Sequence, residues 1–212
     1  RKAAKRSASI DLRRTMRQSL ASGGEPLRLA KRTRPDRPVK IVALCDVSGS
    51  MMDYARPFLA FLAGLMRADS ASDAYLFHTR LVRITNALRD DDPFRALNRI
   101  TLLADGFGGG SKIGANLRQF SDSYARNFVD GRSVVIILSD GYDSENPEVL
   151  GTALAKLKRR GCKVIWLNPL KGWKGYEPVA QGMAAALPHL DAFAAATTLT
   201  DLANLEHMLA RL

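Results

Sequence analysis

The chain has 212 residues, of which 46% are hydrophobic, so it can build one α/β domain with a sizeable core. Residues 1–40 hold 13 Lys and Arg against 3 Asp and Glu, whereas residues 41–212 hold 19 against 18. The formal net charge of +11 therefore belongs mainly to an N-terminal arm. No apolar run approaches the roughly 20 residues of a membrane span, which excludes a membrane-spanning helix.

Residues 1–38 form this basic arm, and the sequence predicts a helix and an edge strand in it. Ser9 is a candidate N-cap for a helix over residues 9–20, and residues 27–31 alternate apolar and polar side chains. The positive charge suits an acidic partner or nucleic acid. No aromatic residue is interleaved for base stacking, but nucleic-acid binding through the arm remains an alternative.

A second domain, residues 39–212, follows the arm. Residues 39–45 are apolar apart from Lys40, which predicts a buried strand. A helix is expected to follow from about Asp53, with Pro57 tolerated near its start. Later segments alternate between strands and helices. Expected strands span 74–78, 81–84, 133–138, 163–167 and 191–195, and expected helices span 93–103, 113–128, 146–161, 179–187 and 199–212.

This alternation predicts an α/β fold with a Rossmann-like, mostly parallel central sheet and helices on both faces. The tight connection between the strands at 74–78 and 81–84 predicts one antiparallel strand at a sheet edge. In such sheets, binding sites lie at the carboxyl ends of the strands, near the point where the strand order reverses. We therefore expect the loops after residues 45 and 138 to open on the same edge.

Oxygen-bearing side chains gather at this expected edge. Asp46, Ser48 and Ser50 follow the first central strand, Ser111 lies at the end of a glycine-rich loop, and Asp140 follows the second central strand. Carboxylate and hydroxyl oxygens suit a hard cation such as Mg²⁺, which takes about six oxygen ligands. The sequence thus predicts a site for Mg²⁺, or for Mn²⁺ or another divalent ion.

Several enzyme motifs fail at this site. A phosphate-binding loop needs Gly-Lys-Ser/Thr, but Lys112 is preceded by Ser111 and followed by Ile113. A hydrolase nucleophile elbow needs glycine two residues before the serine, where Asp46 stands. A Mg²⁺-dependent hydrolase or phosphotransferase, with Asp140 or Asp143 as the base, remains an alternative. The main hypothesis is a module, not an enzyme, whose cation captures an Asp or Glu of another protein.

The motifs at residues 46–50 and 139–141 resemble the von Willebrand factor type A (VWA) domain and its metal-ion-dependent adhesion site (MIDAS). The resemblance implies the VWA fold, and it implies that Asp46, Ser48, Ser50, Ser111 and Asp140 surround the metal. The middle motif of that family normally supplies threonine, whereas this chain has Ser111.

Motifs outside the site are similar to the CoxE-like family, at residues 10–15, 23–27, 45–51, 166–170 and 186–191. The resemblance implies partnership with a MoxR-type AAA+ ATPase and maturation of a metalloenzyme, notably the molybdenum–copper site of carbon monoxide dehydrogenase. Cys45 and Cys162 are predicted to be structural thiols in a reducing compartment, so we expect a cytoplasmic location. Full-length relatives usually carry a further N-terminal region, so we expect a chain that begins at Arg1 to be a piece of a longer protein.

Two aromatic residues, Trp173 and Tyr176, lie in the loop around the glycine-bounded segment 172–175. Trp173 is within that segment, and Tyr176 directly follows it. If they are exposed, they are candidate anchors for a protein partner. Packing of the loop against the domain is the alternative.

Overall fold

The structure is a computed structural model that describes residues 39–90, 111–198, 201 and 204–205. The chain divides between Pro38 and Val39 into two units, and every described residue belongs to the second. The predicted arm, the predicted helix over 93–103 and most of the one over 199–212 lie outside the described residues. Within the described part of the chain, no helix is long and apolar enough to cross a membrane.

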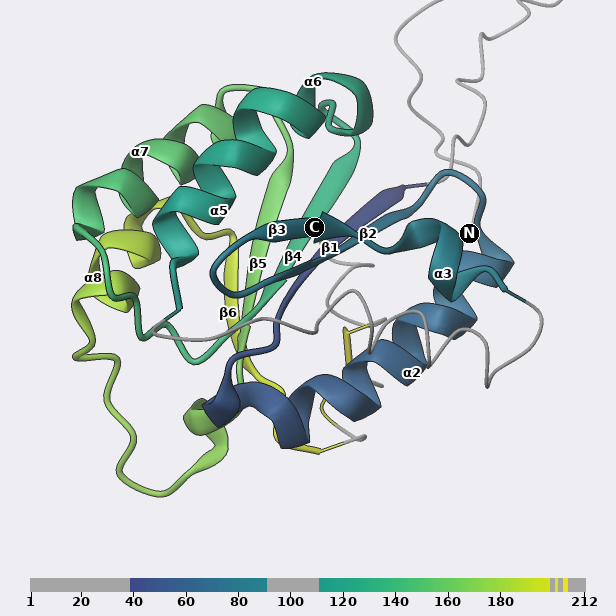
Figure 1. The fold of residues 1–212 in the computed structure, drawn as a ribbon. Coiled ribbons are helices and arrows are strands. Elements are labelled where there is room, and N and C mark those ends of the chain that lie inside the picture. Colours follow the sequence, from purple (N-terminus) through teal and green to yellow (C-terminus); the bar gives the residue numbers. More distant parts are fainter. Residues whose placement is uncertain (1–38, 91–110, 199–200, 202–203, 206–212) are drawn as a thin grey trace, which may run out of the picture. The chain divides into compact units, whose positions relative to one another are not determined.

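Six strands of the described residues form one sheet in the order β3-β2-β1-β4-β5-β6 (Figure 1). All neighbours are parallel except the antiparallel pair β2 and β3 at one edge. Successive strands run outward from β1 to one edge and from β4 to the other, so the strand order reverses between β1 and β4. The strands are β1 (Lys40–Asp46), β2 (Asp73–Phe77), β3 (Leu81–Arg83), β4 (Ser133–Leu138), β5 (Lys163–Asn168) and β6 (Ala192–Ala195).

Helices cover both faces of this sheet (Figure 1). One face packs against α2 (Met52–Ala68) and α3 (Thr85–Leu88); the other packs against α5 (Ile113–Gln119), α6 (Ala125–Phe128), α7 (Pro147–Lys158) and α8 (Gln181–Ala186). Alternate residues of β1 enter the two cores, with Ala43 on the α2 side and Leu44 on the other. Burial on both faces explains why β1 is apolar almost throughout.

The structure confirms the predicted fold class, including the antiparallel edge strand. Two details differ. Pro57 lies inside α2 rather than near its start, which removes one i→i−4 hydrogen bond from that helix. The single helix expected over residues 113–128 is divided by a π-helical segment, Phe120–Tyr124. There Phe120 and Tyr124 both contact Tyr75 of β2 edge-on, at centroid distances of 5.1 and 5.0 Å.

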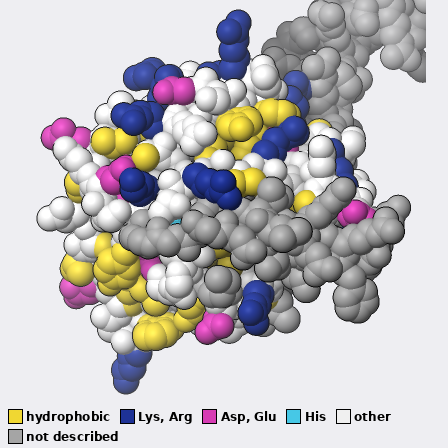
Figure 2. All heavy atoms as spheres, in the orientation of Figure 1, with side chains coloured by type: hydrophobic (Ala, Val, Ile, Leu, Met, Phe, Trp, Pro, Cys, Tyr) yellow, Lys and Arg dark blue, Asp and Glu magenta, His cyan; other side chains and the backbone are white. Residues whose placement is uncertain are grey.

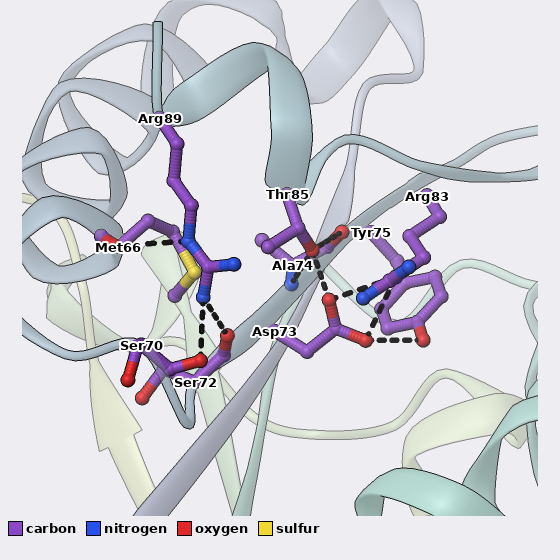
Figure 3. Close-up of polar contacts among 9 residues, drawn as sticks. All are labelled: Met66, Ser70, Ser72, Asp73, Ala74, Tyr75, Arg83, Thr85 and Arg89. Carbon is purple, nitrogen blue, oxygen red and sulfur yellow. Dashed lines mark hydrogen bonds and ion pairs between the residues drawn. The ribbon is translucent and has the colours of Figure 1, made fainter.

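A buried carboxylate, Asp73, begins β2 at the amino end of the sheet, in the centre of Figure 3. Its two oxygens accept from Nε of Arg83 at 2.9 and 3.1 Å, and Oδ2 accepts from the Tyr75 hydroxyl at 2.6 Å. The Thr85 hydroxyl donates to Oδ1. Arg83 also stacks over the Phe128 ring at 4.5 Å. Asp73 thus ties β2 to β3, α3 and α6.

Candidate metal centre

The centre begins at Asp46, the last residue of β1, whose side chain is fully buried. The Ser48 backbone N–H donates to Oδ1 at 2.9 Å, and the Ser139 hydroxyl donates to Oδ2 at 2.9 Å. The Ser111 hydroxyl lies within 3.3 Å of Oδ2 and 3.4 Å of Oδ1. Residues from three separate loops therefore converge on one carboxylate at the carboxyl edge of the sheet.

A second carboxylate, Asp140, lies two residues after the end of β4. Its Oδ2 accepts from the Ser50 hydroxyl at 2.7 Å, and its Oδ1 accepts from the Tyr142 N–H at 3.1 Å. The Ser50 hydroxyl also lies 3.3 Å from that of Ser48. The structure thus brings all five predicted residues together, at the point where the strand order reverses between β1 and β4.

The electrostatics of the centre are unusual because its two carboxylates are buried with neutral donors alone. Burial raises the pKa of the Asp46 carboxyl above its usual range, and the charge of Asp140 raises it further. Hydrogen bonds from Ser48 and Ser139 lower this pKa in part. No Lys or Arg of the described residues forms an ion pair with Asp46 or Asp140. A buried charge is normally paired or coordinates a metal.

The donor set fits a hard cation. It contains two carboxylates and three hydroxyls, which are the oxygen ligands that hard cations prefer. The described residues hold no group of three or more His, Cys, Asp and Glu side chains that could bind a metal ion, so the neutral serine hydroxyls are essential to this centre. Neighbouring ligands of an octahedral Mg²⁺ ion lie roughly 3 Å apart. The oxygen pairs of this centre, at 2.7, 3.3 and 3.4 Å, have that spacing. Ser48, Ser50 and Ser111 would supply neutral oxygens, with Asp46 and Asp140 supplying charge.

The surrounding loops are held by residues to which the sequence analysis gave no metal role. Ser139 bonds Asp46 directly, and Ser144 holds the Ser111 carbonyl through its N–H at 2.9 Å and its hydroxyl at 2.7 Å. Gly141 has φ +83°, and a Cβ there would lie 2.3 Å from Met183. The position of Ser139 directly after the apolar run of β4 is a sequence feature that could have indicated its role in the centre. The sequence offers no comparable feature for Ser144.

Two more residues complete this frame. The Asp143 carboxylate accepts from the N–H groups of Ile113 and Gly114 at 3.1 and 2.7 Å, so it anchors the start of α5. The Asn168 amide donates to the Asp140 carbonyl at 2.9 Å and to the Tyr176 hydroxyl at the same distance. Asn168 therefore connects the centre to the loop that carries both aromatic residues singled out in the sequence.

A hollow of about 360 Å³ opens beside the centre. Ser50 is exposed at its border, while Ser48 and Ser111 are buried except for a small fraction. The buried His78, which follows β2, also lines this hollow. Among the described residues, the lining is Ser48, Gly49, Ser50, His78, Ser111, Tyr142, Asp143 and Ser144. A group from outside can therefore reach the hydroxyls from this side.

The sheet order and this edge of hydroxyls and carboxylates define a VWA-type domain. A family model described as "VWA domain containing CoxE-like protein" matches residues 1–202. The chain belongs to that CoxE-like family. No curated protein matches the chain.

Solved structures share the fold at low sequence identity. Proximal thread matrix protein 1 from the mussel byssus, in a structure with a zinc-occupied MIDAS motif, is 16% identical with a TM-score of 0.53, over 82% of this chain and 47% of that one. The pilus adhesin SpaC from Lactobacillus rhamnosus GG is 14% identical with a TM-score of 0.52, over 86% of this chain and 31% of that one. The chain thus spans less than half the length of either protein.

A third neighbour is matched along its whole length. It is an aerotolerance-related membrane protein from Bacteroides fragilis NCTC 9343, crystallised with multiple mutations to serines. It is 12% identical with a TM-score of 0.50, over 82% of this chain and 100% of that one. At these identities, the three likenesses establish the fold alone.

Proposed function

We propose that this chain is a metal-dependent protein-interaction module, in which a divalent cation at the candidate centre binds a carboxylate of a partner protein. Membership of the VWA CoxE-like family supports this role. Mg²⁺ is the expected ion, because the donors are hard oxygen atoms. When bound, the ion supplies an electron-poor coordination site for an Asp or Glu side chain.

The observation that carries the proposal is the pair of buried carboxylates, Asp46 and Asp140, with which no Lys or Arg of the described residues forms an ion pair. Asp46 is fully buried and Asp140 is 4% exposed, and both receive only neutral hydrogen bonds. Such an arrangement is unfavourable until a positive charge is added. The exposed Ser50 and the adjoining hollow leave that charge accessible to another molecule.

The partner in this proposal is a MoxR-type AAA+ ATPase together with its client metalloenzyme, of the carbon monoxide dehydrogenase type. This part follows from the CoxE-like membership and its implied role, whereas a cytoplasmic location is expected from the thiols Cys45 and Cys162. The basic arm, residues 1–38, is suited to an acidic surface on that partner. The arm lies outside the described residues, so its contribution, like nucleic-acid binding, stays a prediction.

The contacts of Asp143 argue against the alternative of a hydrolase or phosphotransferase. A general base needs an oxygen that can take a proton from the attacking group. Both oxygens of Asp143 accept backbone N–H groups of α5, and both oxygens of Asp140 accept from Tyr142 and Ser50. Both candidate bases are therefore engaged in positioning, and we expect no turnover of nucleotide or phosphoester.

Calorimetric titration with Mg²⁺ tests the centre. We expect Asp46→Ala to abolish Mg²⁺ binding while the circular dichroism spectrum keeps its native shape. Asp130→Ala is the matched control, because Asp130 precedes β4 at the opposite end of that strand and bonds Lys40. Unchanged Mg²⁺ binding by Asp46→Ala would show that the centre is assigned wrongly.

Co-purification with a tagged MoxR-type AAA+ ATPase tests the partner. We expect the complex to form in Mg²⁺, to dissociate in chelator and to be lost in Asp46→Ala. A complex that survives chelator would argue against a bridging metal, and no complex under any condition would remove the ATPase from the proposal.

A further inference from the structure

Most of the exposed large apolar side chains in the described residues lie in loops at the carboxyl edge of the sheet, the edge that carries the candidate centre. Such side chains number four among the described residues: Tyr142 and Trp173 at 59% exposure, Val179 at 75% and Val39 at 49%. Val39 precedes β1 at the amino end of the sheet, whereas the other three follow β4 and β5 at the carboxyl edge. Figure 2 shows hydrophobic side chains at the lower left, where Figure 1 draws the loop between β5 and α8. We call Tyr142, Trp173 and Val179 the apolar rim.

The loop that carries Trp173 is fixed by hydrogen bonds at its base. Leu170 N–H donates to Asn168 Oδ1 at 2.8 Å, and the Thr197 hydroxyl donates to the Pro169 carbonyl at 2.6 Å. A Cβ on Gly172 would lie 2.3 Å from Thr197 Oγ1, so the loop packs closely against the segment after β6. An aromatic side chain that stays exposed on a fixed loop loses little conformational entropy when a partner covers it.

Hydrogen bonds also connect the apolar rim to the candidate metal ligands. Tyr142 N–H donates to Asp140 Oδ1 at 3.1 Å. On the other side, Asn168 joins the Asp140 carbonyl to the hydroxyl of Tyr176, whose N–H bonds the Trp173 carbonyl at 3.1 Å. Tyr142 of the apolar rim also lines the hollow beside the centre, and the hydrogen bonds through Asn168 lead from Asp140 to the loop of Trp173. The exposed Lys112 directly follows Ser111 on the same edge of the sheet.

We propose that the apolar rim recognises an acidic protein segment that carries bulky apolar side chains beside its metal-binding carboxylate. This inference rests on the proposed function and names the partner chemistry of the same site. The cation and Lys112 attract the acidic group, while Trp173 and Val179 cover the neighbouring apolar side chains. A rigid, exposed aromatic residue next to a polar anchoring point has the character of an interface hot spot. The rim therefore selects among the many carboxylates that a cation alone would accept.

Fluorescence anisotropy with labelled synthetic peptides tests this selection in Mg²⁺ buffer. One peptide carries Asp between Leu and Phe, a second carries Asp between Ser and Gly, and a third replaces the Asp of the first with Asn. We expect the first peptide to bind about tenfold more tightly than the second, which is the effect of one hot-spot side chain. Trp173→Ala should remove this preference without changing calorimetric Mg²⁺ binding, and Val39→Ala should preserve it.

The outcomes separate the two proposals. If the two Asp peptides bind equally, or if Trp173→Ala still prefers the peptide with Leu and Phe, the proposed role of the apolar rim is wrong while the metal function stands. If chelator or the change of Asp to Asn has no effect, the metal function itself is wrong. Absence of binding by all peptides overturns both. Binding of phosphatidylglycerol vesicles that Trp173→Ala abolishes would assign the rim to a membrane surface and overturn the peptide proposal.

Discussion

Two buried carboxylates, Asp46 at the end of β1 and Asp73 at the start of β2, are neutralised in opposite ways. Asp73 is 1% exposed and is held by the guanidinium of Arg83 and by the hydroxyls of Tyr75 and Thr85. Asp46 is 0% exposed and receives one N–H and two hydroxyl groups, with no cation from the described residues. The first has its counter-charge within the fold. The second has no counter-charge among the described residues, and in the proposed function a bound cation supplies it.

The pKa of Tyr75 reflects the same difference. Burial raises the pKa of its hydroxyl well above the usual value, and the hydrogen bond to Asp73 raises it further, so Tyr75 is a permanent donor. The cluster of Asp73, Tyr75, Arg83 and Thr85 is therefore a structural contact in which the protein itself balances the buried charge. At the carboxyl edge, burial raises the pKa of Asp46, and its hydrogen bonds from Ser48 and Ser139 offset this only in part.

Removal of the Arg83 charge should give the largest loss of stability. Arg83→Met keeps an apolar stem over Phe128 but leaves Asp73 buried without its cation. Because the Arg83 side chain is 37% exposed, we expect a loss of about 2–3 kcal/mol, below the range for a fully buried pair. Urea unfolding measures it, with the exposed Arg159→Met as control. If the loss were no greater than that of the control, the ion pair with Arg83 would contribute little, and Asp73 would resemble Asp46 in lacking an effective cation among the described residues.

Neutralisation of the two carboxylates should separate them by their response to Mg²⁺. Asp46→Asn removes an unpaired buried charge, so we expect unchanged or higher thermal stability in chelator. At Mg²⁺ a hundredfold above the dissociation constant, the wild-type protein should gain about 2.7 kcal/mol and Asp46→Asn nothing. Asp73→Asn should show the reverse: lower stability in chelator, with the full gain from Mg²⁺. Thermal unfolding of the two variants with and without Mg²⁺ measures these effects. If both variants gained the same stability from Mg²⁺, Asp46 and Asp73 would not differ in their dependence on a bound cation.

A third carboxylate, Asp191, extends the comparison toward the surface. Its carboxyl is partly desolvated, which opposes ionisation, but hydrogen bonds from Lys158, Val164 and Lys163 outweigh this and lower its pKa. Its contribution is therefore present above the unfolded-state pKa of about 4 and is lost as pH falls through the lower folded value. Both lysines are partly exposed, so we expect less than about 1 kcal/mol. Asp191→Asn should match the wild-type stability near pH 2 and fall below it at pH 7.

Sequence reasoning succeeded where a single physical pattern determines the structure. The apolar run ending at Asp46 requires a strand buried on both faces, and an Asp-x-Ser-x-Ser sequence after it requires a loop rich in oxygen ligands. The same reasoning identified the antiparallel edge through the tight connection between β2 and β3.

It missed contacts that depend on tertiary packing. Ser144 bonds the Ser111 carbonyl across distant loops, and no local pattern encodes that bond. Ser139 follows directly after an apolar run, but its partner, Asp46, lies on another strand and is set by the tertiary fold. The π-helical segment at Phe120–Tyr124 has both of its end residues in contact with Tyr75 of β2, whereas the periodicity of residues 113–128 is that of one continuous helix. Residues 1–38 and 91–110 lie outside the described residues, and the predictions there stay predictions.

The two tryptophans can serve as intrinsic fluorescence probes, because one is buried beside the centre and the other is exposed on the apolar rim. Trp166 is fully buried and donates from Nε1 to the Ser139 carbonyl at 2.9 Å, whereas Trp173 stands exposed on the apolar rim. Their emission should therefore separate into a short-wavelength component, shielded from acrylamide, and a long-wavelength component that acrylamide quenches. Cation loading can be followed through the first and partner docking through the second, on the unlabelled protein and in a single cuvette.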